Sequence, residues 1–352
     1  MALLTTGPEE HSLVLVVHHI AADGESIRPL LTDLLHFYQE HAEGTSADGT
    51  AGEMTATEPR PVLPVQYADY TLWQKTLLGD EKDPTSLAAR QLEYWKNNLR
   101  DLPDTLPLPY DHPRPTTATH HGQHITFPIT PELHQQLKNL AHTHNTSLFM
   151  VLQAAVATLL TRLGAGTDIP LGTPTAGRTD TTLHNLIGFF VNTLILRINT
   201  SGNPTYLDIL HRTKETALNA YNNQDLPFEL LVEHLNPTRT LAHHPLFQTM
   251  LTLQENPQPT HHTPHLTAQL HTTPTNIAKF DLTIALIENT HPNGQPNGIT
   301  GYLEYATDLF THHTAQTLTT RLTNLLHTIT QNPHTPIHHI NTLTPQEHQQ
   351  LT

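Results

Sequence analysis

One segment constrains the fold more than any other, because an apolar run, two histidines, a short loop and a helical stretch follow one another. SLVLVVHHIAADG (12–24) opens with apolar, β-branched residues, which are typical of a buried β-strand. SIRPLLTDLLHFYQEHA (26–42) has helical periodicity and Ser26 near its start. ALLTT and GPEE precede the strand and indicate a first strand and a turn. The sequence therefore predicts a hairpin, a short loop and a helix.

Two adjacent histidines lie where this predicted strand ends. Because side chains alternate along a strand, we expect one of His18 and His19 to face a cleft and the other to pack inward. Asp23 follows after small residues that favour a loop. A histidine placed in this way is a candidate general base, with the aspartate holding the loop. On the residues alone, a core histidine and a capping aspartate explain the pattern equally well.

Composition excludes several classes of function. The formal net charge is −15, which argues against nonspecific binding to nucleic acid or to an anionic membrane surface. The sequence has no run of 18 apolar residues, and its first residues lack the features of a signal peptide, so we expect a cytoplasmic protein. Cysteine is absent, which excludes disulfides, cysteine nucleophiles and cysteine-based zinc sites.

The 29 histidines make a metal-binding protein one alternative. A zinc site needs side chains that converge, as in HExxH on a helix, and the sequence contains no HExxH. Most of the histidines stand in stretches rich in Thr, Pro and Asn, such as QPTHHTPHL (258–266). We therefore interpret them as neutral polar surface residues and expect no metal site.

HHIAADG (18–24) fits the HHxxxDG pattern of the condensation domains of nonribosomal peptide synthetases. Six further segments resemble motifs of that family and follow its order: YADYTLWQK (67–75), GTPTAGR (172–178), IGFFVNTLILR (187–197), NQDLPFELLV (223–232), HPLFQTML (244–251) and KFDLTIAL (279–286). The resemblance extends over essentially the whole chain.

The resemblance implies an α/β fold, an α+β sandwich of two chloramphenicol-acetyltransferase-like lobes that form a V. We expect residues 1–113 to be the remainder of the N-terminal lobe with HHxxxDG, and residues 114–340 to be the C-terminal lobe. Residues 341–352 resemble the start of a linker toward an adenylation domain. The Pro-dense segment 102–115 is expected to join the lobes, and a strand at 298–310 is expected to cross between them.

Periodicity predicts several further helices, at 131–144, 147–164, 206–221 and 312–331. The second is nearly all apolar and is therefore expected to be buried. Tyr67, Tyr70 and Trp73 recur at helical spacing and are expected to pack within the first lobe. The stretch 43–61 lacks periodicity and is expected to be a loop.

Segments similar to SxAQxRLW and RHExLR precede HHxxxDG in the family, and this sequence contains neither. The resemblance is therefore to an N-terminally truncated condensation domain, with an incomplete first lobe. A fragment, a misassigned start and a degraded module all fit this pattern. We expect low or no activity of the chain alone.

The resemblance implies an acyltransferase that forms the amide bond of a nonribosomal peptide, a secondary metabolite such as an antibiotic. Its substrates would be aminoacyl or peptidyl thioesters on the phosphopantetheine of donor and acceptor peptidyl carrier domains, beside a neighbouring adenylation domain. The substrate's own amine attacks, so no covalently bound cofactor is expected. HHIAADG followed by SIRPL favours the joining of two L-residues. An epimerization domain of the same superfamily and an inactive fragment that only docks carrier domains remain alternatives.

The match also implies roles for single residues. His19 is expected to lie at the reacting groups of the substrates, as a base or as a positioning group. His18 is expected to be structural. Asp23 is expected to form an ion pair that holds the loop, with Arg178 of GTPTAGR as its partner. In the family, a tunnel for the substrates runs between the two lobes. Gly24 is expected to bring the backbone close to this tunnel and to offer its N–H to an oxyanion, or to be a plain turn glycine.

Two more residues are expected to line the tunnel between the lobes. The segment FFVN (189–192) is predicted to be a strand of the C-terminal lobe at the tunnel wall, which places Phe190 and Asn192 there. Asn192 is expected to bind the pantetheine arm or the peptide backbone, and packing in the core is an equal alternative.

Overall fold

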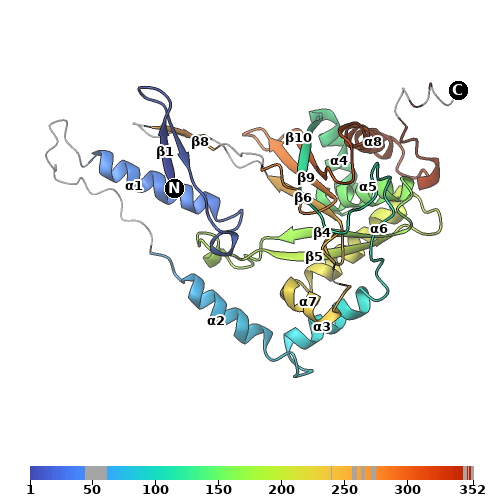
Figure 1. The fold of residues 1–352 in the computed structure, drawn as a ribbon, viewed down its shortest axis with the longest axis horizontal. Coiled ribbons are helices and arrows are strands. Elements are labelled where there is room, and N and C mark those ends of the chain that lie inside the picture. The colour runs from blue at the N-terminus through green and yellow to red at the C-terminus, as the bar shows by residue number, and fades with distance from the viewer. Residues whose placement is uncertain are drawn as a thin grey trace. The chain divides into compact units, whose positions relative to one another are not determined.

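A computed structural model describes residues 1–43, 62–238, 240–255, 260–262, 266–270, 275–343, 347 and 349. The chain divides into two units, both drawn in Figure 1. Unit 1 consists of Met1–Leu87, Thr175–Asn192 and Thr260–Gln269, and unit 2 of Ala88–Pro174, Thr193–Pro259 and Leu270–Thr352. Residues 88–113 thus belong to the larger unit 2, and two later segments belong to unit 1. The division into lobes at residue 113 stays a prediction.

Unit 2 is built on a six-stranded sheet with the order β3-β10-β9-β6-β4-β5. Its strands are β3 (Gly122–Ile129), β4 (Asp168–Thr175), β5 (Asn192–Asn199), β6 (Thr249–Glu255), β9 (Leu282–Thr290) and β10 (Pro296–Ala306). β10 runs antiparallel to β3 and β9, whereas β6 runs parallel to β9 and β4. The mixed sheet and its helices confirm the α/β fold class. The expectation of a strand that crosses between lobes is wrong, because all of β10 lies in unit 2.

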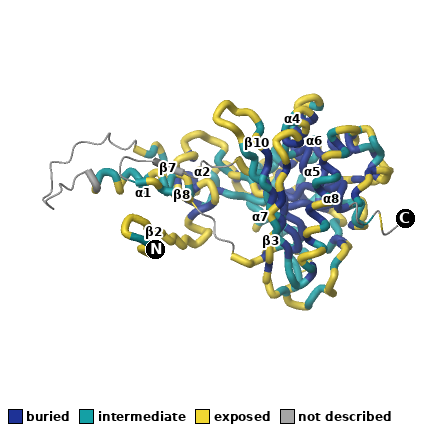
Figure 2. The backbone as a smooth tube through the Cα atoms, turned by 90° about the horizontal axis from the view of Figure 1, so that it is seen from above, coloured by how far each residue is buried: buried dark blue, intermediate teal, exposed yellow. Residues whose placement is uncertain are grey.

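Four helices pack against one another beside this sheet (Figure 1). They are α4 (Pro131–Thr143), α5 (Leu148–Arg162), α6 (Tyr206–Tyr221) and α8 (His312–Gln331), all at the predicted places. Each begins after a Ser or Thr whose side chain accepts a backbone N–H of the first turn: Thr130, Ser147, Thr205 and Thr311. Residues 150–160 of α5 are all buried, as its apolar sequence predicts. Figure 2 shows the buried residues gathered in this part of the molecule.

Two shorter helices complete the described helices of unit 2: α3 (Leu87–Asn98), whose first residue closes unit 1, and α7 (Phe228–Leu235). Side chains of α3 hold the segment that precedes α7. The Trp95 indole N–H donates to the carbonyl of Asn223 at 2.8 Å, and the Gln91 amide donates to the Asp225 carboxylate at 2.8 Å. The NQDLPFE segment is therefore a structural connection inside unit 2.

Unit 1 contains the predicted N-terminal hairpin and helices. β1 (Ala2–Thr5) pairs antiparallel with β2 (His11–Val14), and α1 (Ile27–Glu43) and α2 (Tyr67–Leu78) follow. A second small pair consists of β7 (Thr260–His262) and β8 (Thr267–Gln269).

The prediction of a buried strand at 12–17 is wrong. β2 ends at Val14, all four of its residues are exposed, and Val16 beyond it is 84% exposed. Within the described residues β2 belongs to a two-stranded sheet with β1. An apolar run forms a buried strand only where a second layer covers it, and no second layer covers this hairpin within the described part of the chain.

Two further predictions fall largely outside the described residues. They are the loop at 43–61, of which only residue 43 is described, and the linker at 341–352.

Candidate active site

The two histidines lie in a turn after β2 and not on a strand. His19–Ala21 form a single 3₁₀ turn, η1, and the His18 ring caps it, because His18 Nδ1 accepts the Ile20 N–H at 3.1 Å. The expectation that strand alternation sends the two rings to opposite faces is therefore wrong. His18 is exposed and holds the local backbone.

The His19 ring is held in one tautomer by its own loop. Its Nδ1 lies 3.0 Å from the carbonyl oxygen of Ala22. Because a carbonyl oxygen can only accept a hydrogen bond, Nδ1 carries the proton, and Nε2 of the neutral ring keeps a lone pair. The ring also stands edge-on to Phe189, with ring centroids 5.2 Å apart and an interplanar angle of 87°. His19 is exposed and is thus available to a substrate as a proton acceptor.

Asp23 is buried and fixes the loop that carries His19. Its Oδ2 accepts the Phe190 N–H at 3.0 Å, and its Oδ1 accepts hydrogen bonds from Ser26 and from Arg178. Burial alone raises the pKa of Asp23, but hydrogen bonds from Ser26, Phe190 and Arg178, together with the Arg178 charge, hold that pKa below its usual value. The carboxylate is therefore ionised at neutral pH and holds the loop as an anchor.

The predicted ion pair between Asp23 and Arg178 is present. Arg178 Nη2 lies 2.9 Å from Asp23 Oδ1, and the two side chains are 4% and 3% exposed. Arg178 Nη1 donates to the carbonyls of Leu183 and Leu186 at 2.6 and 2.8 Å. The guanidinium also lies 4.0 Å from the centroid of the Phe190 ring. One side chain thus joins the histidine loop to the segment 178–190.

Ser26 and Gly188 complete this network, and the sequence analysis gave neither of them a role in the site. Ser26 Oγ lies 2.7 Å from Asp23 Oδ1 and 2.9 Å from the carbonyl oxygen of Gly188, and it accepts the Gly188 N–H at 3.1 Å. Arg178 Nη2 donates to the same hydroxyl at 2.9 Å. The sequence signal for Ser26 was only its place before a helix, because its partner Gly188 lies 162 residues further along the chain.

The remaining predicted site residues lie nearby with different surroundings. Phe190 is 4% exposed and packs against Tyr67 and Tyr70, so its ring belongs to a small apolar cluster. Asn192 is half-buried and is the first residue of β5, which begins after the phenylalanines and not at residue 189 as predicted. Gly24 is exposed. The tunnel and oxyanion roles of these residues stay predictions.

The three aromatic residues of α2 divide into two kinds. Tyr70 is buried, and the Tyr67 hydroxyl donates to the carbonyl of Phe189 at 2.8 Å, so these two pack as predicted. Trp73 is 49% exposed, but its ring also packs as predicted, with its centroid 6.0 Å from that of Tyr70.

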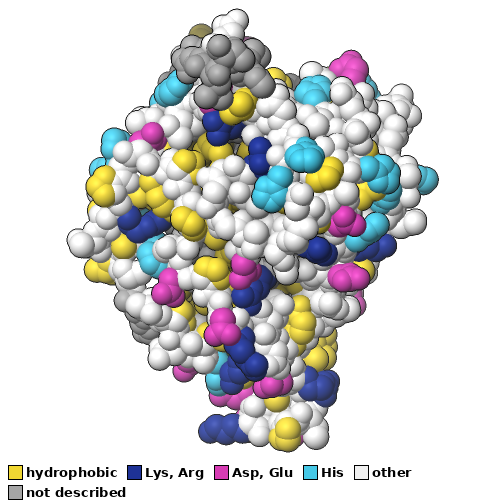
Figure 3. Space-filling model, turned by 90° about the vertical axis from the view of Figure 1, so that its right-hand side faces the viewer, with side chains coloured by type: hydrophobic (Ala, Val, Ile, Leu, Met, Phe, Trp, Pro, Cys, Tyr) yellow, Lys and Arg dark blue, Asp and Glu magenta, His cyan; other side chains and the backbone are white. Residues whose placement is uncertain are grey.

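The other histidines that the structure describes do not gather into a metal site. Figure 3 shows histidine side chains at several separate places on one face of the molecule. Within the described ranges, no group of three or more His, Asp or Glu side chains is arranged to hold a metal ion. Nor does any helix in that part of the chain have the length and apolar character needed to cross a membrane.

Comparisons with known proteins show which family this chain is similar to. The family model described as "Condensation domain" matches residues 1–352. The chain is 48% identical over 349 residues to a dimodular nonribosomal peptide synthase of Bacillus subtilis, covering 99% of this chain and 14% of that protein. It is 40% identical over 349 residues to an isonitrile lipopeptide synthase of Mycobacterium tuberculosis, again covering 99% and 14%. The chain therefore spans a small part of these curated relatives.

A solved structure is similar over most of the chain. It is the complex of the X-domain and OxyB from teicoplanin biosynthesis, with 32% sequence identity and a TM-score of 0.80. The similarity covers 93% of this chain and 69% of that chain.

Proposed function

Because the chain belongs to the condensation-domain family of nonribosomal peptide synthetases, we propose that its His19 site forms an amide bond between two carrier-tethered thioesters. The observation that carries this proposal is the tautomer of His19. Its Nδ1–H donates to the Ala22 carbonyl, which leaves the lone pair on Nε2 of an exposed ring, and a buried ion pair holds the loop that carries this ring. This arrangement suits a residue that accepts a proton from an attacking amine.

The reaction needs few groups from the protein. The acceptor amine attacks the donor thioester carbonyl, a C–N bond forms, and the ammonium proton of the tetrahedral intermediate passes to His19 Nε2. The C–S bond then breaks, and the leaving sulfur takes the proton back, which yields an amide and a free thiol. The thioester is already activated, so positioning and proton transfer account for the role of the protein.

The proposal includes partners and substrates. The two thioesters would be aminoacyl or peptidyl groups on the phosphopantetheine arms of donor and acceptor carrier domains, with an adenylation domain as neighbour. The segment after HHIAADG supports two L-residues as substrates. Asp23 and Arg178 act through His19, since both are buried away from solvent and hold its loop.

The test is amide formation from two carrier domains loaded with aminoacyl groups. We expect turnover, even if weak, that disappears in His19→Ala and persists in His41→Ala, which changes an exposed histidine of α1. The same assay decides the expectation of low activity. Turnover that survives His19→Ala would refute the proposed role of this site.

A second candidate function is docking without catalysis. The support is the similar X-domain structure, which was solved as a complex with the protein OxyB. In this case the chain would bind loaded carrier domains and form no amide, and His19→Ala would leave the binding affinity unchanged. Measuring carrier binding beside product formation separates the two functions.

A further inference from the structure

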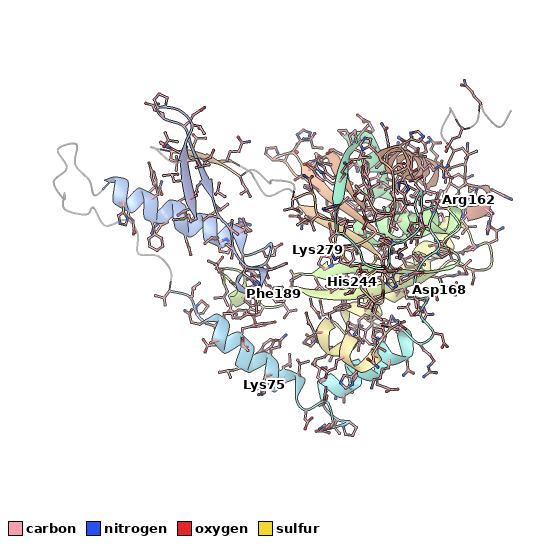
Figure 4. The ribbon with its side chains drawn as sticks, viewed as in Figure 1. Lys75, Arg162, Asp168, Phe189, His244 and Lys279 are labelled. Carbon is pink, nitrogen blue, oxygen red and sulfur yellow. The ribbon has the colours of Figure 1, made fainter. Side chains whose placement is uncertain are left out.

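The His19 ring has one hydrogen bond to its own loop, and the donor is Nδ1. A single bond of this kind fixes the tautomer only while the ring stays in place. A second contact that restrains the ring is the edge-on Phe189 side chain, with the two ring centroids 5.2 Å apart. Edge-to-face ring pairs are directional, so they favour one ring orientation over others. Figure 4 labels Phe189 in unit 1.

Phe189 is itself fixed from both sides by the loop that carries His19. The residue before it, Gly188, donates its N–H to Ser26 at 3.1 Å, and the residue after it donates to Asp23 at 3.0 Å. The backbone therefore leaves little freedom for Phe189 to move relative to residues 19–26. Its ring is half-buried, so it is both supported by the protein and close to the exposed imidazole.

A third anchor comes from α2. The Tyr67 hydroxyl donates to the carbonyl oxygen of Phe189 at 2.8 Å, and the Tyr67 ring packs edge-on against Phe190 at 5.1 Å. The first residue of α2 thus holds the peptide that presents the Phe189 ring.

We propose that Phe189, held by the Tyr67 hydroxyl, is a positioning residue that keeps the His19 imidazole oriented with its lone pair on Nε2 toward the substrate. The expected effect on turnover rests on the proposed function, whereas the expected effect on the orientation of the His19 ring does not. Phe189 touches no reacting atom in this account and acts only through His19.

The direct test is the ¹⁵N spectrum of the His19 ring, whose signals are assigned by their loss in His19→Ala. We expect the full chain to show one protonated nitrogen, Nδ1, and one unprotonated nitrogen, Nε2. In Phe189→Leu the two signals should move toward each other, because the ring samples both tautomers. Phe189→Tyr keeps the aromatic edge and should restore the original spectrum.

The matched control is Phe37→Leu, the same change at an exposed phenylalanine beside His36 on α1. It should leave the His19 signals unchanged. Tyr67→Phe removes only the hydroxyl that holds the Phe189 carbonyl, and it should shift the signals in the same direction by a smaller amount. This variant keeps the test decisive if Phe189→Leu fails to fold.

Kinetics give the second measurement. In the carrier-loaded assay, Phe189→Leu should lower kcat by about 10- to 100-fold with little change in KM for either carrier, since a misplaced catalytic group costs rate and not binding. Unchanged His19 signals in both Phe189→Leu and Tyr67→Phe would overturn the proposal. If His19→Ala leaves turnover intact while the signals respond to Phe189, the proposed function fails and the positioning role stands.

Discussion

At the scale of single residues, the stability of unit 1 is expected to depend strongly on its buried ion pair. Arg178 places one nitrogen on Asp23 and Ser26 and the other on two backbone carbonyls. Arg178→Leu leaves the buried Asp23 carboxylate without its cation and should lower the free energy of unfolding of unit 1 by about 3–5 kcal/mol. Arg178→Lys should restore little of the lost stability, because an ammonium group cannot make the hydrogen bonds that the two terminal nitrogens of the planar guanidinium donate. Urea unfolding with hydrogen exchange at residues 23–26 and 183–190 measures both variants.

The control for this prediction is Arg28→Leu, which changes an exposed arginine of α1 in the same unit. Surface substitutions of this kind usually change stability by less than about 0.5 kcal/mol. Equal effects of Arg28→Leu and Arg178→Leu would show that the network does not stabilise the loop.

Substitution by alanine should have different effects on stability at two glycines near the site. A Cβ on Gly188 would lie 2.2 Å from a ring carbon of Tyr67, whereas a Cβ on Gly24 would meet no atom within 4 Å. We expect Gly188→Ala to destabilise unit 1 by about 1–3 kcal/mol through overpacking, and Gly24→Ala to fold normally. Thermal unfolding of the two variants decides this.

At the scale of elements, a clamp of two half-buried side chains and the buried Asp281 carboxylate holds the proline-dense segment 102–115 to the sheet of unit 2. Arg114 contacts both carboxylate oxygens of Asp281, just before β9, and the Tyr110 hydroxyl lies 3.0 Å from Asp281 Oδ2. Burial, with the charge of Asp281, raises the pKa of Tyr110, so its hydroxyl stays protonated and can donate. Asp281→Leu should lower the free energy of unfolding of unit 2 by up to about 3–5 kcal/mol, because the half-buried Arg114 cation loses its carboxylate partner.

The double variant Arg114→Met with Asp281→Leu tests the cause of that loss. Replacing both charges by apolar side chains removes the unpaired ion, so much of the lost stability should return. Denaturant unfolding with unchanged m-values would make the comparison valid. A double variant that is as unstable as the sum of the single variants would contradict the clamp.

The elements also show why prediction from the sequence succeeded in places and failed in others. The helices α4, α5, α6 and α8 depend on periodicity and on capping side chains within a few residues, which a sequence displays directly. The burial of β2 depends on which layer covers it, and the sequence of β2 contains no information about that layer. Likewise, the partners of Ser26 are set by tertiary structure. The pairing of Asp23 with Arg178 was predictable only because two family motifs marked both residues.

At the scale of the whole molecule, the described residues of unit 2 include three histidines with lowered pKa values, so the stability of this unit should depend on pH. Burial is the main cause at each of them. His134 in α4 is fully buried; the nearby Glu288 partly opposes the shift and Lys138 adds to it. At His144, the charges of His211 and His334 lower the pKa further. His244 lies among the rings of Phe228, Phe247 and Phe280.

The sign of the dependence follows from these directions. A histidine whose pKa is lower in the folded state binds a proton more readily in the unfolded chain, where its pKa is about 6.5. The stability that the neutral ring contributes is therefore present above about pH 6.5 and is lost as pH falls toward the folded-state pKa. Urea unfolding of unit 2 should show a free energy of unfolding that declines as pH falls from about 7 to about 5.

His134→Gln tests the contribution of one of these histidines. It should reduce the change in the free energy of unfolding with pH by up to about 1.4 kcal/mol per pH unit, the contribution of one proton. Comparing the two proteins at pH 8, where the unfolded-state histidines are neutral, isolates the packing cost of the substitution. An unchanged slope in His134→Gln would show that this histidine does not contribute to the acid sensitivity of unit 2.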